Sequence, residues 1–206
     1  MNVLLINGSP HENGCTFTAL SEVADQLKKN GLETHIFHIG ADPIADCTGC
    51  GECTESSQCV FDSDRVNQCI GLLREADGLV VGSPVYFAGP SGGICSFLNR
   101  LFFLKYGAYA NKPAASVVVC RRGGATAALD RLNKYFAIAH MPIVSSQYWA
   151  VVHGTTPGEA LQDHEGMQTM RALGRNMAWL IRSIQAAKEN VSPPKHEAKI
   201  RTNFIR

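Results

Sequence analysis

Four cysteines gathered in one short segment are the strongest chemical signal in this sequence. Their spacing is Cys-x2-Cys-x2-Cys-x5-Cys, formed by Cys47, Cys50, Cys53 and Cys59. Structural zinc sites usually take two Cys-x2-Cys pairs from separate hairpins, whereas successive x2 intervals are typical of loops that wrap an iron–sulfur cluster. Gly49 and Gly51 would let backbone N–H groups turn toward the sulfur atoms. The spacing indicates an iron–sulfur site, while zinc and a metal-free or disulfide-forming thiol site stay open as alternatives.

The segment around these cysteines is acidic. Between Gly31 and Asp64 there are seven acidic residues and no lysine or arginine. Such surroundings would lower the reduction potential of a bound cluster and present a negative face to a basic electron-transfer protein. A solvated acidic loop is an equally good interpretation of the same charges.

A loop near the N-terminus carries groups that could hold a phosphate. The apolar run Val3–Asn7 is followed by Gly8-Ser9-Pro10-His11-Glu12-Asn13-Gly14-Cys15-Thr16, after which a helical pattern begins. Backbone N–H groups, hydroxyls and the positive end of a helix dipole favour an anion there. The loop has neither a Walker ending nor Gly-x-Gly-x-x-Gly, which favours a mononucleotide or flavin phosphate over ATP or a dinucleotide. An ordinary cap on a surface helix is the alternative.

Two further loops follow later strand-like runs. In the first, the segment 82–93, Tyr86 and Phe87 could stack on a planar ring, and its glycines permit close approach of the backbone. In the second, Arg121 and Arg122 precede two glycines, so a guanidinium and N–H groups could face the electron-rich edge of a flavin. Taken singly, two adjacent aromatics are more often packing residues, and the arginines could equally be solvated.

The elements that must position these loops alternate along the chain. Short, almost purely apolar runs predict buried parallel strands at Val3–Asn7, Thr34–Ile39, Leu79–Ser83, Ala115–Cys120 and Ile143–Trp149. Helical periodicity predicts helices at Thr16–Asn30, Asp64–Ala76, Gly93–Lys105, Thr126–His140 and Glu159–Ala187. The alternation indicates an open three-layer α/β sandwich. In a doubly wound sheet, ligands bind beyond the carboxyl ends of the strands, where all three loops would lie.

Size and composition limit the class of protein. The chain has 206 residues, a formal net charge of +1 and 18% charged residues, which argues against a disordered chain or an electrostatic nucleic-acid binder. The N-terminus does not resemble a signal peptide and no stretch resembles a bilayer span, so we expect a cytoplasmic protein without membrane insertion. We expect one domain over residues 1–187, followed by a tail, 188–206, which is either frayed or an arm whose Phe204 and Ile205 dock on a neighbouring subunit.

The three loops together resemble the flavodoxin-like, NAD(P)H-dependent FMN reductase family. The resemblance spans nearly the whole chain, and its most specific element is Ser83-Pro84-Val85-Tyr86-Phe87. It implies a flavodoxin-like three-layer sandwich with a five-stranded parallel sheet. It also implies that the FMN phosphate is surrounded by Ser9, His11, Asn13, Cys15 and Thr16. By the same resemblance the isoalloxazine ring contacts Pro84, Val85, Tyr86, Phe87, Gly89, Arg122, Gly123 and Gly124.

Two residues depart from the family pattern. His11 stands where the family often has arginine or lysine, and Cys15 stands where it often has asparagine. Both changes remove a group that would hold the phosphate, so its binding should be weaker or dependent on pH.

The cysteine spacing resembles the compact motif of the iron–sulfur flavoproteins, a branch of this family with a [4Fe-4S] cluster beside FMN. The resemblance makes Cys47, Cys50, Cys53 and Cys59 the cluster ligands. It implies an oxidoreductase that passes electrons from NAD(P)H or a ferredoxin through FMN to a small-molecule or protein acceptor, with no side chain assigned as acid or base. It also implies a homodimer or homotetramer. A non-enzymatic electron carrier, a cysteine-based redox sensor without a cluster and a flavin-free zinc module are the alternatives.

Overall fold

The strands pair into a parallel sheet with the order β2-β1-β3-β5-β6. The computed structural model describes residues 1–104, 107–195, 197–198, 200 and 202, and within them the parallel strands are β1 Asn2–Asn7, β2 Glu33–His38, β3 Gly78–Tyr86, β5 Ala114–Cys120 and β6 Val151–His153. The central strands β1, β3 and β5 are buried along most of their length, because helices cover both faces of the sheet. This strand order is that of flavodoxin-like sheets, so the predicted fold class is confirmed.

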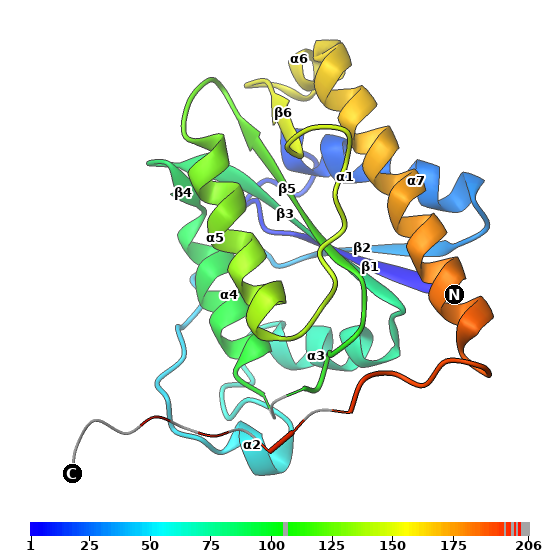
Figure 1. The fold of residues 1–206 in the computed structure, drawn as a ribbon. Coiled ribbons are helices and arrows are strands. Elements are labelled where there is room, and N and C mark those ends of the chain that lie inside the picture. The colour runs from blue at the N-terminus through cyan, green and yellow to red at the C-terminus, as the bar shows by residue number, and fades with distance from the viewer. Residues whose placement is uncertain (105–106, 196, 199, 201, 203–206) are drawn as a thin grey trace.

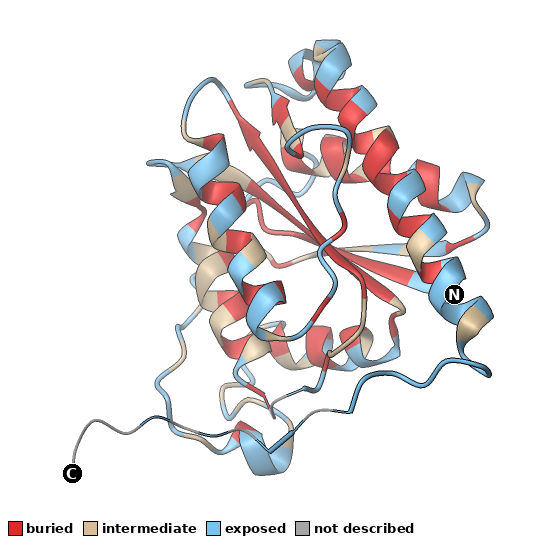
Figure 2. Ribbon diagram, in the orientation of Figure 1, coloured by how far each residue is buried: buried red, intermediate tan, exposed pale blue. Residues whose placement is uncertain are grey.

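The helices form the two outer layers. They are α1 Cys15–Lys29, α2 Cys53–Ser56, α3 Val66–Glu75, α4 Gly92–Phe102, α5 Ala125–Ile138, α6 Pro157–Gln162 and α7 His164–Ala187. Figure 1 shows α1 and α7 on one face of the sheet and α3, α4 and α5 on the other. Figure 2 shows that the buried residues follow the strands and the helix sides turned toward them. Both faces are thus removed from water along the central strands. On the edge strand β2, which was predicted to be buried, Phe37 alone is buried, because an edge strand is covered less completely than a central one.

The last strand of the sheet is not where we predicted it. The prediction of Ile143–Trp149 is wrong: Ile143 makes only an isolated bridge to Ala114, and the edge strand is β6. Val118 of β5 pairs in register with Val151, so pairing with β5 selects the later apolar run. Trp149 lies outside the sheet and is more than half exposed.

The predicted helix Glu159–Ala187 is two helices. The helix is interrupted at Asp163, whose carboxylate accepts a hydrogen bond from the N–H of Gly166 (2.9 Å) and caps α7. The same side chain accepts from the N–H of His153 at the end of β6 (2.7 Å). Asp163 therefore ties the second helix to the sheet edge, and this long-range bond outweighs the helical periodicity around it.

The segment 82–93 is only partly a loop. β3 continues through it to Tyr86, and β4, Gly89–Pro90, pairs back antiparallel on the end of β3. Phe87 and Ala88 form the tip of this hairpin with φ values of 49° and 60°. The hairpin extends the sheet beyond its carboxyl edge.

The C-terminal segment adds little to this architecture. The described residues after Ala187 form neither helix nor strand, and Phe204 and Ile205 lie outside the described residues. Within the part of the chain that the structure describes, no helix combines the length and the apolarity that a membrane span requires.

Candidate functional site

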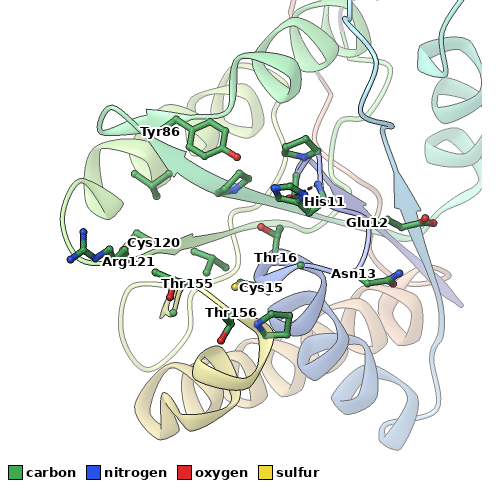
Figure 3. A pocket seen from close by; sticks show the side chains of 18 residues that line it. His11, Glu12, Asn13, Cys15, Thr16, Tyr86, Cys120, Arg121, Thr155 and Thr156 are labelled. Carbon is green, nitrogen blue, oxygen red and sulfur yellow. Dashed lines mark hydrogen bonds between the residues drawn. The ribbon is translucent and has the colours of Figure 1, made fainter.

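A cavity of about 780 Å³ lies at the carboxyl ends of β1, β3 and β5 (Figure 3). Its volume is within the range of pockets that bind cofactors. Figure 3 shows Tyr86 on one side of the cavity, with Cys15, Thr155 and Thr156 on the opposite side. The cavity brings together these residues predicted to bind the cofactor: Ser9, His11, Asn13, Cys15, Thr16, Pro84, Val85 and Tyr86.

The remaining residues predicted to bind the cofactor are not among those that line the cavity; they are Phe87, Gly89, Arg122, Gly123 and Gly124. Phe87, at the hairpin tip, is fully exposed to solvent. Gly124 has a φ of 90°, and a Cβ on it would lie 2.7 Å from the Cα of Ala88. A side chain at position 124 would therefore push the hairpin away from the loop between β5 and α5.

The wall of the cavity that follows β5 and β6 is formed by Val119, Cys120, Arg121, Gly154, Thr155, Thr156 and Pro157. Of these, the sequence pointed only to Arg121. The sequence did contain a signal for residues 154–157, because a Gly- and Thr-rich stretch leads into a proline at the first turn of a helix.

The N-terminus of α1 opens into the cavity. Its N-cap is Gly14, which offers no side-chain cap, and the first turn contains no acidic residue. The first N–H groups of a helix have no partner within the helix, and together with the dipole they favour a negative charge. Gly14, Cys15 and Thr16 all line the cavity at this point. The arrangement suits a phosphate, and it is the observation on which the fit of FMN to this chain depends.

The loop before α1 is held by its own side chains. Asn7 accepts a hydrogen bond from the N–H of Ser9 (3.1 Å) and donates to the carbonyl of Glu12 (2.9 Å). Ser9 accepts in turn from the N–H of His11 (3.1 Å). His38 on β2 contacts the carbonyl of Ser9 through Nε2 at 2.8 Å. These bonds fix the loop's shape before any ligand binds, which lowers the entropy cost of binding.

Cys15 sits at the start of α1 as a neutral thiol. Burial raises the pKa of this thiol, its own backbone N–H lowers it, and the negative charge of Glu159 also raises it. A thiol that stays protonated places no negative charge beside a bound phosphate.

The cavity wall at Thr155 and Thr156 is stabilised by Glu159. Thr156 and Glu159 form a capping box at the start of α6, and the carboxylate of Glu159 also accepts from the N–H of Thr155 (2.7 Å). The hydrogen bonds from the hydroxyl and the N–H of Thr155 hold the pKa of Glu159 below its ordinary value of 4.5. The folded state therefore favours the ionised carboxylate.

Replacing Glu159 by glutamine should lower the melting temperature in a pH-dependent way. A depressed folded-state pKa contributes stability that is present above the unfolded pKa and is lost as pH falls through the folded value. The difference in melting temperature between the wild type and Glu159→Gln should be largest above pH 4.5 and should shrink at lower pH. Thermal unfolding followed by circular dichroism between pH 3 and 7 measures it, and a difference that stays constant over that range would contradict the argument.

A second, smaller cavity lies under the cysteine-rich loop that follows β2. It is lined by Cys47, Cys50, Cys53 and Cys59 together with Phe61, Arg100, Phe103 and their neighbours. All four cysteines are free thiols. Burial raises the pKa of Cys53, and the neighbouring Cys47 contributes the next largest effect. The fold thus collects the four predicted ligands around one point.

The backbone between these cysteines has the turns that a cluster-binding loop needs. Gly49 and Gly51 have φ values of 69° and 84°, a region that side chains other than glycine rarely adopt. The N–H of Gly49 points at the Sγ of Cys47 (3.4 Å). The N–H of Cys59 donates to the side chain of Asn67 on α3 (2.8 Å), which anchors the far end of the motif.

The donor set fits an iron–sulfur cluster in its chemistry and in its backbone turns. The cavity measures only about 20 Å³, and in the described residues no group of three or more histidine, cysteine or acidic side chains is already spaced to hold a metal ion. Four thiolates from one loop are the ligands that a cubane uses. Loading such a cluster therefore requires the loop to rearrange, and Cys50, which is exposed, has room to move.

Comparison with known proteins places the chain among flavoproteins. The sequence profile of the NADPH-dependent FMN reductase family matches residues 1–156. An iron-sulfur flavoprotein of Methanocaldococcus jannaschii is 30% identical over 193 residues, which cover 90% of this chain and all of that protein. A second one, from Methanosarcina thermophila, is 26% identical over 193 residues, covering 92% of this chain and all of the relative.

Solved structures support the fold. The structure of RosB with bound 8-demethyl-8-formylriboflavin-5'-phosphate superposes with a TM-score of 0.71 at 16% identity. The superposition covers all of this chain and 94% of the RosB chain. A flavodoxin from the domain Archaea has a TM-score of 0.59 at 12% identity, covering 88% of this chain and 99% of its own. At such identities these likenesses bear on the fold alone.

Proposed function

Since the chain belongs to the iron–sulfur flavoprotein branch of the NADPH-dependent FMN reductase family, we propose that it carries a [4Fe-4S] cluster beside its FMN. The chain is an FMN-dependent oxidoreductase. Electrons would come from NAD(P)H or a ferredoxin and leave for a small-molecule or protein acceptor. The observation that carries the proposal is the convergence of four free cysteines on one cavity.

The two sites are joined by one helix. The N-cap of α4 is Ser91, whose hydroxyl donates to the carbonyl of Gly8 in the loop before α1 (2.7 Å). It ends near Arg100 and Phe103, which line the cysteine cavity. Eleven residues of α-helix span roughly 16 Å, so the two sites lie about one helix length apart in the same chain. This arrangement supports electron transfer within a single subunit.

The residues of this chain bind and orient, and we assign none of them as an acid or base. The N-terminus of α1, with Ser9 and Thr16, would hold the FMN phosphate, while Pro84, Val85 and Tyr86 would lie along the ring. When bound, FMN supplies the exchange between two-electron donors and one-electron acceptors. The four cysteines would hold the cluster. The protein's contribution is position and electrostatics rather than proton transfer.

The function is tested by purifying the full chain without oxygen and recording its visible absorption spectrum together with FMN, iron and acid-labile sulfide. Flavin bands, a broad additional shoulder and about four irons per chain are expected. Flavin without iron after anaerobic reconstitution would contradict the cluster and leave the thiols a sensor role. Mixing the protein with NADH, NADPH or a reduced ferredoxin then identifies the donor by the bleaching of the flavin bands.

We also propose that the chain assembles as a homodimer or homotetramer. Phe87 is fully exposed at the hairpin tip, and Tyr148 and Trp149 are 60% and 56% exposed. Exposed aromatic side chains of this size are typical of contact surfaces. A Tyr148→Ser, Trp149→Ser double variant should have a lower mass by light scattering while its melting temperature stays the same. A wild-type mass equal to the 22.3 kDa of one chain would contradict assembly.

A further inference from the structure

A buried arginine lies at the cysteine cavity, although the cysteine-rich segment itself contains no basic residue. Arg100 comes from α4, and its side chain has no exposed surface. A buried guanidinium is unfavourable unless its N–H groups are bonded and its charge is paired. Its position beside four thiols therefore has to be explained by the contacts it makes.

Each nitrogen of the Arg100 guanidinium has a partner in or next to the cysteine-rich loop. Its Nη1 pairs with the carboxylate of Asp64 and reaches the carbonyl of Ala45 (3.3 Å), and its Nη2 donates to the carbonyl of Phe61 (2.7 Å). The remaining donor, Nε, points at the Sγ of Cys59 at 3.1 Å. One nitrogen of this fixed fork is thus aimed at a sulfur atom while the other two hold the fork in place.

Asn99, which precedes Arg100 on α4, is linked by hydrogen bonds to Cys47 at the start of the cysteine motif. Asn99 donates to the carboxylate of Asp46 (2.8 Å), and the same carboxylate oxygen accepts from the N–H of Cys47 (2.7 Å). The last turns of α4 therefore contact the first cysteine through Asp46 and the last cysteine directly through Arg100. The helix that links the two sites also holds both ends of the cysteine motif.

We propose that Arg100 is a positioning residue that orients Cys59 and raises the reduction potential of the bound cluster through its hydrogen bond to the Cys59 sulfur. This inference rests on the proposed function. Reduction adds one electron and one negative charge to the cluster, so a positive N–H donor at a ligand sulfur stabilises the reduced state more than the oxidised state. Arg100 thereby opposes the acidic residues of the segment, and Asp64 offsets part of its charge.

The test uses the full chain, reconstituted without oxygen, in the variants Arg100→Met, Arg100→Lys and Asp64→Asn. Iron and FMN are counted first, and the cluster is then titrated with dithionite and mediators. For Arg100→Met we expect the equilibrium constant for one-electron reduction to fall about tenfold, which is about 59 mV. Lysine keeps the charge without the guanidinium fork, so the reduction potential of Arg100→Lys should lie between those of the wild type and Arg100→Met. Asp64→Asn should shift the potential upward, because it removes the negative charge that offsets Arg100. Asparagine can still accept from the N–H of Val66, so the local turn should be kept.

Arg74→Met is the matched control. Arg74 contacts the same loop through the carbonyl of Ser57 (2.6 Å) and no sulfur, so its removal should leave the potential unchanged. The inference is overturned if Arg100→Met holds four irons and its reduction potential is unchanged, or if Arg74→Met shifts the potential by the same amount. In both cases the proposed function stands. If Arg100→Met holds no iron, Arg100→Lys decides, because lysine keeps the charge without the guanidinium fork: a potential below that of the wild type supports the inference and an unchanged potential overturns it. A wild type without iron overturns the proposed function and the inference together.

Discussion

Replacing Cys50 by serine is expected to remove nearly all iron from the protein and to leave its FMN in place. A cubane needs four thiolates, and a serine hydroxyl is a poor substitute for a soft thiolate ligand. Cys50 is exposed, so the substitution costs little packing. We expect iron to fall from about four atoms per chain to below one, while the flavin bands stay unchanged. Iron and sulfide analysis beside the visible spectrum measures this.

The matched control is Cys95→Ser. Cys95 lies on α4, is partly buried and lines neither cavity. It should keep its full complement of iron, which shows that the loss in Cys50→Ser is specific to the cysteine-rich loop. If Cys50→Ser keeps about four irons per chain, Cys50 is not a cluster ligand.

Replacing Cys15 by aspartate is expected to weaken FMN binding about a hundredfold. A new negative charge at the N-terminus of α1 would stand beside the phosphate that this helix end is proposed to hold. Two negative groups about 4 Å apart repel by roughly 1–4 kcal/mol per unit charge, and about 3 kcal/mol corresponds to about two orders of magnitude in Kd. Fluorescence titration of the apoprotein with FMN measures the change.

The same substitution separates binding from folding. An acidic residue in the first turn of a helix is favourable for the dipole, so the flavin-free Cys15→Asp protein should melt no lower than the wild type. Cys15→Asn, of similar size and without the charge, should bind FMN within about threefold of the wild type. If aspartate and asparagine weaken binding equally, the effect is one of packing and the phosphate does not lie at this helix end.

Most of the sheet could be predicted because its signal is local. β1, β3 and β5 are nearly pure apolar runs, and a strand buried on both faces leaves that pattern wherever it stands in the sequence. The edge strand could not be predicted in the same way. The segment 143–149 begins with the apolar pair Ile143-Val144 and β6 begins with Val151-Val152, and only the register of Val118 with Val151 selects between them. That choice depends on a partner strand more than thirty residues away.

The cofactor site was predicted in part for a related reason. The loop after β1 and the segment Pro84–Tyr86 line the cavity as expected, because glycines, hydroxyls and aromatics after a strand are visible in the sequence. The wall at Thr155 and Thr156 was missed with the strand that precedes it. Gly124 does not line the cavity and makes room for the hairpin tip at Ala88, a close approach that no local pattern indicates.

The sequence by itself determined the groups whose chemistry depends on neighbours along the chain. The cysteine motif and the loop before α1 are short segments in which spacing alone brings donors together. Only the tertiary structure decided which charges surround them. Arg100 stands 41 positions from Cys59 and reaches it because α4 packs under the loop, so a segment that contains only acidic charges acquires a buried cation. Contacts of this range follow from packing between elements, and no local pattern encodes them.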